Sequence, residues 1–246
     1  MPARTFRICD RESPNYNKRP VCYTREPHVP PEPQTKAQSG QEDPGRIPRL
    51  GAWLFKHRTS IPLPIAVGLL LIPPSAFCRS CPSGPSRIFG ALIVVLGELL
   101  RLWGVRHIGV ISRTRSDRVG PLVETGPFAM VRNPLYLGNI LLWIGFTVSA
   151  GLLGLVPVVA AVLALAYHAI VRWEERLVES KVGASYRAYV DRVPRWVPRL
   201  TGAPRGSSPS RALFSWRETL YSERGTLMAI AAGFALLAVK DRFWPE

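Results

Sequence analysis

The sequence predicts an all-α integral membrane protein, a multi-span helical bundle of about five transmembrane helices with no Rossmann domain. Three observations support this fold class. Hydrophobic residues make up 47% of the 246-residue chain, and they are concentrated in long runs, as in membrane proteins. The net charge is +15, and the excess of Lys and Arg falls between the runs. No GxGxxG motif follows a strand-like segment, so the usual dinucleotide cradle is absent.

The chain divides into three predicted parts. Residues 1–50 include nine prolines and show no helical or alternating apolar pattern, which predicts a disordered, basic tail. Residues 51–200 form the predicted membrane core. Residues 201–246 combine a cytoplasmic linker with a C-terminal hydrophobic helix, whose apolar run at 226–239 is short for a span.

Two apolar runs come early in the core, at 60–77 and 87–104. Within the second run, Glu98 and Arg101 lie three residues apart and therefore share one helical face. Charged residues inside a span normally face the protein interior or a polar cavity. We therefore expect this pair to point inward.

The third run, residues 135–171, contains no Asp, Glu, Lys or Arg. A single helix of this length would measure about 55 Å, nearly twice the hydrocarbon thickness of about 30 Å. The run is therefore predicted to fold back as a hairpin, with its turn at 149–154.

Charge fixes the predicted orientation. Residues 1–58 and 172–224 each hold 11 Lys and Arg, whereas the 149–154 turn holds none. Five spans with a cytoplasmic N-terminus place every basic segment on the cytoplasmic side. The predicted partner is thus the lipid bilayer. Nucleic acid is not expected, because no recognised nucleic-acid motif is present.

No metal site is predicted. Cys78 and Cys81 form a CxxC pair, but a structural zinc site requires a second close pair of ligands. We interpret them as incidental thiols. The four histidines are scattered without metal-ligand spacing, so no metal is expected.

The first unusual block runs from Leu122 to Gly138. It contains a Gly126-Pro127 turn and a break at Asn133-Pro134, and Pro134 suits the first position of the next helix. Free N–H groups at such a helix start suit a carboxylate or hydroxyl ligand. A simple juxtamembrane turn is the alternative.

The second block begins with Glu174 and Glu175 at the end of the hairpin and continues through residues 183–199. Paired carboxylates at a membrane boundary are costly unless they serve a function. An ordinary polar helix end is the alternative, and the aromatic residues of this block could form an interfacial belt.

Together the two blocks, covering about residues 86–199, resemble the isoprenylcysteine carboxyl methyltransferase family, to which membrane phospholipid methyltransferases are related. The matching residues are Leu122-Val123, Gly126-Pro127-Phe128, Arg132-Asn133-Pro134-Leu135-Tyr136-Leu137-Gly138, Glu174-Glu175 and the stretch from Gly183 to Pro194. The resemblance implies an S-adenosylmethionine cofactor and a lipid-like or prenylated substrate.

The resemblance also implies site residues. The cofactor-binding set is Leu122, Val123, Phe128, Asn133, Pro134, Leu135, Tyr136, Glu174 and Glu175. Arg132 is a candidate catalytic residue. Arg172 is a second, as a replacement for a family arginine where this chain has Ile170. Asn133 stands where eukaryotic members have His, and an amide cannot titrate near neutrality.

Physical chemistry points the same way for the cofactor. A carboxylate such as Glu174 suits an ammonium group, Arg132 suits a carboxylate, and an aromatic face such as that of Phe128 suits a sulfonium cation. Two alternatives remain open: a membrane lipid or sterol-type reductase that uses a nicotinamide cofactor, and a non-enzymatic membrane scaffold.

Overall fold

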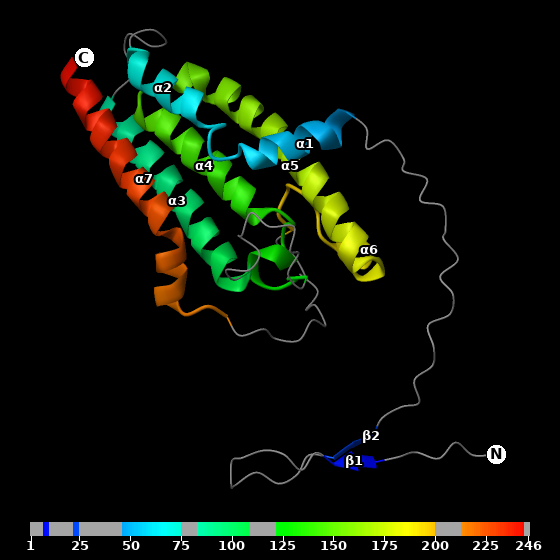
Figure 1. Ribbon diagram of the computed structural model, residues 1–246. Helices are drawn as coiled ribbons and strands as arrows, with labels where there is room; N and C mark the ends of the chain where they lie inside the picture. The colour runs from blue at the N-terminus through cyan, green and yellow to red at the C-terminus, as the bar shows by residue number, and fades with distance from the viewer. Residues whose placement is uncertain are drawn as a thin grey trace. The chain divides into compact units, whose positions relative to one another are not determined.

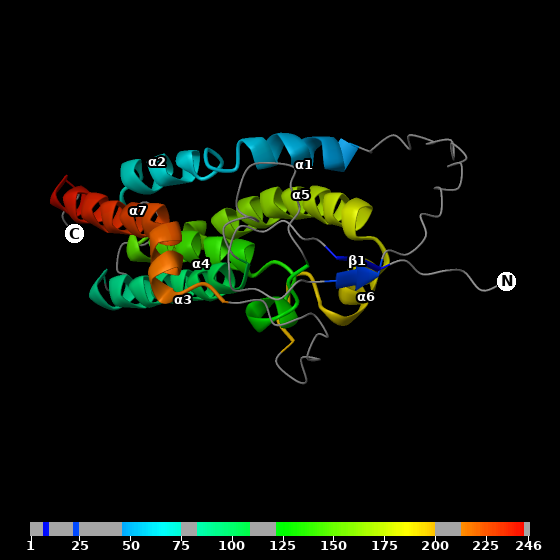
Figure 2. The same cartoon turned by 60° about the horizontal axis from the view of Figure 1, so that its bottom comes forward.

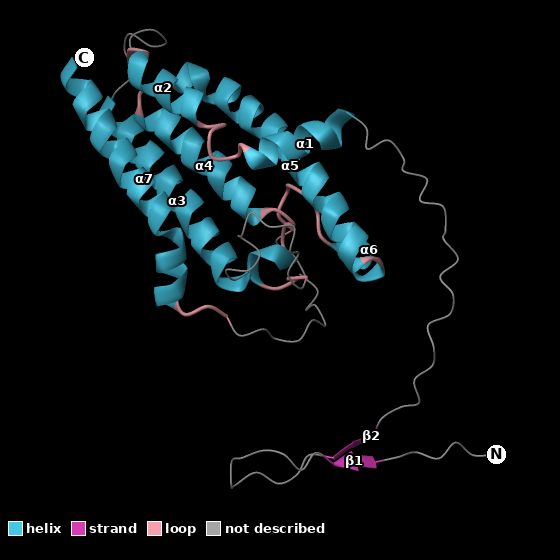
Figure 3. Cartoon of the chain, viewed as in Figure 1, coloured by secondary structure: helices cyan, strands magenta, loops and turns pink. Residues whose placement is uncertain are grey.

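The computed structural model describes residues 7–9, 22–24, 46–74, 83–108, 122–199 and 213–243. The chain separates into two units, Met1–Asp43 and Pro44–Glu246. In the first unit, β1 (Arg7–Cys9) pairs antiparallel with β2 (Cys22–Thr24) (Figure 3). The proline-rich composition did not predict this strand pair. The rest of the predicted tail up to residue 45, and the Cys78–Cys81 pair, lie outside the described residues.

The described part of the second unit is helical (Figure 1). Its elements are α1 (Arg46–Lys56), α2 (Leu63–Leu71), α3 (Ser83–Ile108), the 3₁₀ turn η3 (Gly126–Ala129), α4 (Pro134–Ser149), the 3₁₀ turn η4 (Leu153–Leu155), α5 (Val156–Val182), α6 (Ala184–Arg192) and α7 (Trp216–Phe243). Helix α1 starts inside the stretch predicted to be a tail. Its Pro48 lies in the first helical turn, where proline is tolerated.

The predicted hairpin is confirmed by α4 and α5. Helix α4 begins at Pro134, as expected, and ends at Ser149. Gly151 then adopts a left-handed φ of +73°, a conformation that costs glycine little. The Leu152 N–H donates to the Thr147 carbonyl at 3.1 Å, which closes the turn before α5 begins.

Small residues bring α3 and α4 close together along their length. Gly90, Gly97 and Gly104 repeat every seven residues on α3, and Gly138 and Gly145 do so on α4. A Cβ atom on Gly97 would lie only 2.8 Å from the Gly138 carbonyl oxygen. The backbones can approach this closely because neither position carries a side chain, as at small-residue interfaces between membrane helices.

Helices α5 and α7 pack against this pair (Figure 2). Helix α1 lies along α5, and α7 contacts both α3 and α2. Buried residues of α5, including Leu163 and Ile170, form one apolar cluster. Near the far end of the bundle, Lys240 on α7 donates to the Leu69 carbonyl at 2.6 Å.

Two helices in the described residues, Gly84–Ile108 and Leu153–Val182, are long and apolar enough to cross a membrane, and Pro134–Ser149 is apolar but shorter. Large apolar side chains on α3 and α5 face outward, for example Leu92 at 60% and Leu165 at 73% exposure. This pattern fits a helical membrane protein whose outer surface contacts lipid.

Among the described residues two helices qualify as spans, so the five predicted spans are not confirmed. Helix α2 has nine residues and is therefore about 14 Å long. It ends at Leu71, and Ile72, the residue before Pro73, is extended. Helix α7 has 28 residues, twice the predicted apolar run, because polar residues extend it at the N-terminal end. Ser215 and Glu218 form a reciprocal capping box there, with bonds of 3.2 and 2.8 Å.

Candidate active site

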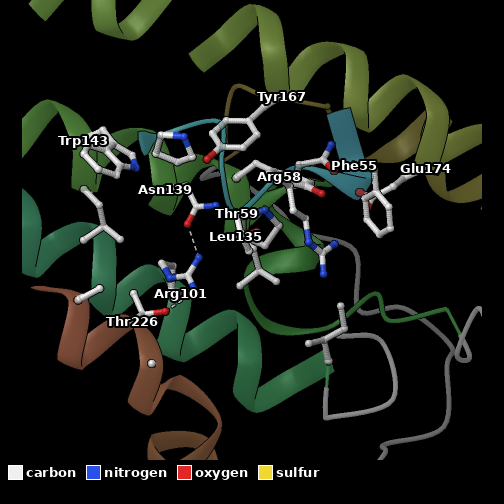
Figure 4. Close-up of a pocket in the computed structure, with 18 of the residues that line it drawn as sticks. Phe55, Arg58, Thr59, Arg101, Leu135, Asn139, Trp143, Tyr167, Glu174 and Thr226 are labelled. Carbon is white, nitrogen blue, oxygen red and sulfur yellow. Dashed lines mark hydrogen bonds between the residues drawn. The ribbon is translucent and has the colours of Figure 1, made fainter. Parts of the chain in front are cut away.

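A large cavity of about 900 Å³ lies within the helical unit. Its volume falls in the range of small-molecule and cofactor sites. Its walls come from α1 and the turn after it, from α2, α3, α4, α5, α6 and α7, and from the loop before α4. Figure 4 shows that polar side chains from several of these elements converge on it.

Ten of the eleven predicted site residues line this cavity: Leu122, Val123, Phe128, Arg132, Asn133, Pro134, Leu135, Tyr136, Glu174 and Glu175. Arg172 does not line it, and neither does the fully buried Ile170. Arg172 lies on the opposite side of α5 from Tyr167 and Glu174, whereas Ile170 is covered by its neighbours in an apolar cluster. The structure thus gathers the residues of both sequence blocks, and their roles remain predictions.

The two blocks are joined by backbone and side-chain hydrogen bonds. The Arg132 N–H donates to the Pro194 carbonyl at 2.9 Å, and the Arg199 N–H donates to the Met130 carbonyl at 2.9 Å. The Tyr189 hydroxyl donates to the Phe128 carbonyl at 2.8 Å. The segment after α6 therefore clamps the loop before α4 in place.

Asn133 takes part in the same clamp. Its side-chain amide donates to the Arg195 carbonyl at 3.3 Å, so this residue ties the start of α4 to the second block. Asn133 also occupies the N-cap position of α4 without a side-chain cap bond. Pro134 has no N–H, and the Leu137 N–H donates to the Asn133 carbonyl at 3.2 Å, so the N–H groups of Leu135 and Tyr136 are the first-turn donors that a ligand or water can satisfy.

Glu175 is held by two arginines. Arg195 donates from Nη2 to Glu175 Oε2 at 2.6 Å and from Nε at 3.1 Å. Arg132 Nη1 lies 3.0 Å from Glu175 Oε1 as an ion pair, without the alignment of a hydrogen bond. The hydrogen bonds to Glu175 raise the pKa of Arg195. Glu175 is therefore a structural link between α5 and both loops.

Glu174, the neighbouring residue, has a different environment. It lines the cavity beside the side chain of Tyr136 at the start of α4. Glu174 and Glu175 both line the cavity, in agreement with the predicted cofactor-binding set.

Arg132 retains unused hydrogen-bonding capacity. Its side chain is only 10% exposed, and Nε and Nη1 have no hydrogen-bond partner among the described residues. The neighbouring Tyr186 accepts a hydrogen bond from Arg132, while burial and the Glu175 carboxylate raise the pKa of Tyr186 to about 12. Buried donors without acceptors are costly, and an anionic ligand would satisfy them.

Several lining residues were not predicted. Arg58, in the turn after α1, lies over the Phe55 ring at 4.3 Å and has no ion pair among the described residues. Both residues lie before the two motif blocks, so no motif pointed to them. Asn139, Tyr167 and Thr226 were also missed, because single polar residues in apolar runs carry no spacing signal.

The inward orientation expected for Glu98 and Arg101 is confirmed. Glu98 is 6% and Arg101 is 7% exposed, and Arg101 Nε lies 3.4 Å from Glu98 Oε2. Arg101 lines the cavity. Charge inside an apolar run was the signal that found this part of the site.

Comparison with known proteins supports a relationship over the same part of the chain. Residues 85–184 match the phospholipid methyltransferase family. The cobalt-zinc-cadmium resistance protein CzcN of Cupriavidus metallidurans is 32% identical over 112 residues, which cover 46% of this chain and 49% of that protein. The nickel-cobalt-cadmium resistance protein NccN of Alcaligenes xylosoxydans xylosoxydans is 30% identical over 156 residues, 62% of this chain and 70% of that protein. No solved structure matches the chain.

Proposed function

The chain belongs to the phospholipid methyltransferase family, and we propose that it is a membrane methyltransferase that uses S-adenosylmethionine to methylate a lipid-like or prenylated substrate. One observation carries this proposal. Two sequence blocks separated by a helical hairpin line one cavity, and that cavity combines a charged end with apolar walls. The relatives' names concern resistance to metals, whereas this proposal rests on the family and the cavity.

The lining residues fit the cofactor. Glu174 offers a carboxylate for its ammonium group, and Arg132 offers buried donors for its carboxylate. Phe128 and Tyr136 offer aromatic faces for its sulfonium centre. When bound, S-adenosylmethionine supplies an electrophilic methyl group.

The protein's own contribution is positioning and exclusion of water. The clamp from the second block fixes Phe128 and Asn133, so the loop is held before any ligand arrives. Asn133 cannot accept a proton near neutral pH, and we assign it to orientation. Arg58 lines the cavity, whereas Arg172 does not, and Arg58 offers a cation to an anionic group of either ligand.

The apolar part of the cavity supports a substrate with a hydrocarbon tail. Leu69 on α2, Leu142 and Phe146 on α4, and Leu237 on α7 line it. A hydrocarbon tail that filled the space between these side chains would remove more of their apolar surface from water. The bilayer would supply such a substrate from the side.

The proposal is tested by incubating membranes that contain the protein with methyl-labelled S-adenosylmethionine and extracting the lipids. We expect label in one lipid class, which identifies the acceptor. Membranes with Glu174→Gln should lose most of this label, and those with Glu179→Gln should keep it, because Glu179 is exposed on the same helix. Absence of label, together with hydride transfer from a labelled nicotinamide cofactor, would favour a reductase instead.

A further inference from the structure

Arg101 occupies the centre of a buried charge cluster where α3 faces α7. Its Nη2 atom lies 2.7 Å from Glu223 Oε2 on α7, and Glu223 is fully buried. Its Nε atom lies 3.4 Å from Glu98 Oε2. Three buried charges inside a helical bundle are expensive to maintain and usually mark a functional position.

Arg101 also holds two neutral side chains that line the cavity (Figure 4). It donates from Nη2 to the Thr226 hydroxyl oxygen at 3.1 Å and from Nη1 to the Asn139 carbonyl oxygen. Asn139 lies beside Tyr167 of α5, and both side chains line the cavity. Since the Asn139 oxygen is engaged by Arg101, the amide N–H is the Asn139 group that can donate toward the Tyr167 oxygen.

This arrangement fixes the direction of both hydroxyl groups. The Thr226 oxygen accepts a hydrogen bond from the Arg101 guanidinium, and the Tyr167 oxygen faces the amide of Asn139, which the same guanidinium orients. Each hydroxyl therefore retains its proton for donation, and both side chains line the cavity. Two such donors suit a ligand group with accepting oxygens.

We propose that Thr226 and Tyr167 form the subsite for the head group of the methyl acceptor, and that this head group carries hydrogen-bond-accepting oxygens. Arg101 and Glu223 are positioning residues that hold the two hydroxyls as donors. This inference rests on the proposed methyltransferase function. It makes α7 part of the active site, although α7 lies outside the family-matched residues 85–184.

The geometry separates this subsite from the cofactor end of the cavity. Glu174, Arg132 and the loop before α4 lie at the cofactor end, and none of them hydrogen bonds to the Arg101 cluster in the described residues. Tyr167 lies between the two ends, with its ring 5.0 Å from that of Tyr136. Substitutions in the Arg101 cluster should therefore weaken use of the methyl acceptor more than binding of the cofactor.

The test compares Glu223→Gln, Tyr167→Phe and the double variant with the wild type, using methyl-labelled S-adenosylmethionine and total membrane lipid extract in detergent. Asp241→Asn is the matched control, because Asp241 also links α7 to α3, through a solvent-accessible ion pair with Arg87 at 2.8 Å. Each single active-site variant should lower kcat/KM for lipid by roughly tenfold, as expected for a lost hydrogen bond to a charged or oriented group. The Kd for S-adenosylmethionine should not change.

The double variant separates positioning from general stability. If Glu223 acts through Tyr167, the double variant should lose less kcat/KM for lipid than the product of the two single losses. Asp241→Asn should leave lipid methylation intact. Unchanged kcat/KM in Glu223→Gln and Tyr167→Phe, or an equal loss of cofactor affinity, would overturn the inference. A wild type that transfers no label to lipid would instead overturn the proposed function.

Discussion

At the scale of single residues, Glu174 and Glu175 show how neighbours in sequence acquire different tasks. Glu175 is bound by Arg195 and paired with Arg132, and its charge is needed to hold the two loops together. Glu174 faces the cavity beside Tyr136, and its charge is available to a ligand. An acidic pair in the sequence could not reveal which of the two residues serves the fold.

This difference predicts that Glu175→Gln mainly lowers stability. The substitution leaves Arg195 and Arg132 without their carboxylate, a loss of about 1.5–3 kcal/mol for a charged hydrogen bond. Thermal unfolding in detergent should show a lower Tm than in the wild type. Glu179→Gln, whose exposed pair with Arg187 spans 3.6 Å, should leave the Tm nearly unchanged. Equal Tm values for Glu175→Gln and the wild type would remove Glu175 from the clamp.

At the scale of elements, the α3–α4 contact sets the frame on which the cavity is built. Helix α4 carries Asn139 and Leu142, and α3 carries Arg101, so the spacing of these helices fixes one wall. The glycines at the contact allow a backbone separation that no larger residue permits.

We therefore predict that Gly97→Ala destabilises the protein, since the new methyl group would lie 2.8 Å from the Gly138 carbonyl oxygen. Overpacking of this kind costs about 1–3 kcal/mol. The matched control is Gly84→Ala on the same helix, where a Cβ atom meets nothing within 4 Å. The free energy of unfolding of the two variants is compared by reversible unfolding in detergent. Equal values would show that α3 and α4 can move apart to accept the methyl group without loss of stability, which would contradict the prediction.

Some elements followed from the sequence and others did not. The α4–α5 hairpin was predictable, because a charge-free run longer than a bilayer must turn. The length of α7 was not, since polar residues such as Arg217 and Arg224 interrupt the apolar pattern of a helix that begins after the Ser215 cap. The contribution of Arg58 and Thr226 to the cavity depends on how α1 and α7 pack, which no local pattern encodes.

At the scale of the whole molecule, the distribution of charge predicts that the C-terminal end of α5 faces the cytoplasm and the η4 turn faces the other side. Ser180→Cys and Gly154→Cys test this orientation in a background without the four native cysteines, since both positions are exposed. In intact cells a membrane-impermeant thiol reagent should label position 154 and spare position 180. The reverse pattern would invert the topology and move the proposed site to the outer face.

The central claim concerns the cofactor, and binding of S-adenosylmethionine by the purified protein tests it most directly. The affinities of the wild type, Glu174→Gln and the control Glu179→Gln should be measured in detergent by titration with labelled cofactor. The account predicts saturable binding by the wild type and Glu179→Gln. It predicts an affinity lower by roughly tenfold or more for folded Glu174→Gln, the loss of one charged hydrogen bond. No binding by the folded wild type, or equal affinities for all three proteins, would contradict it.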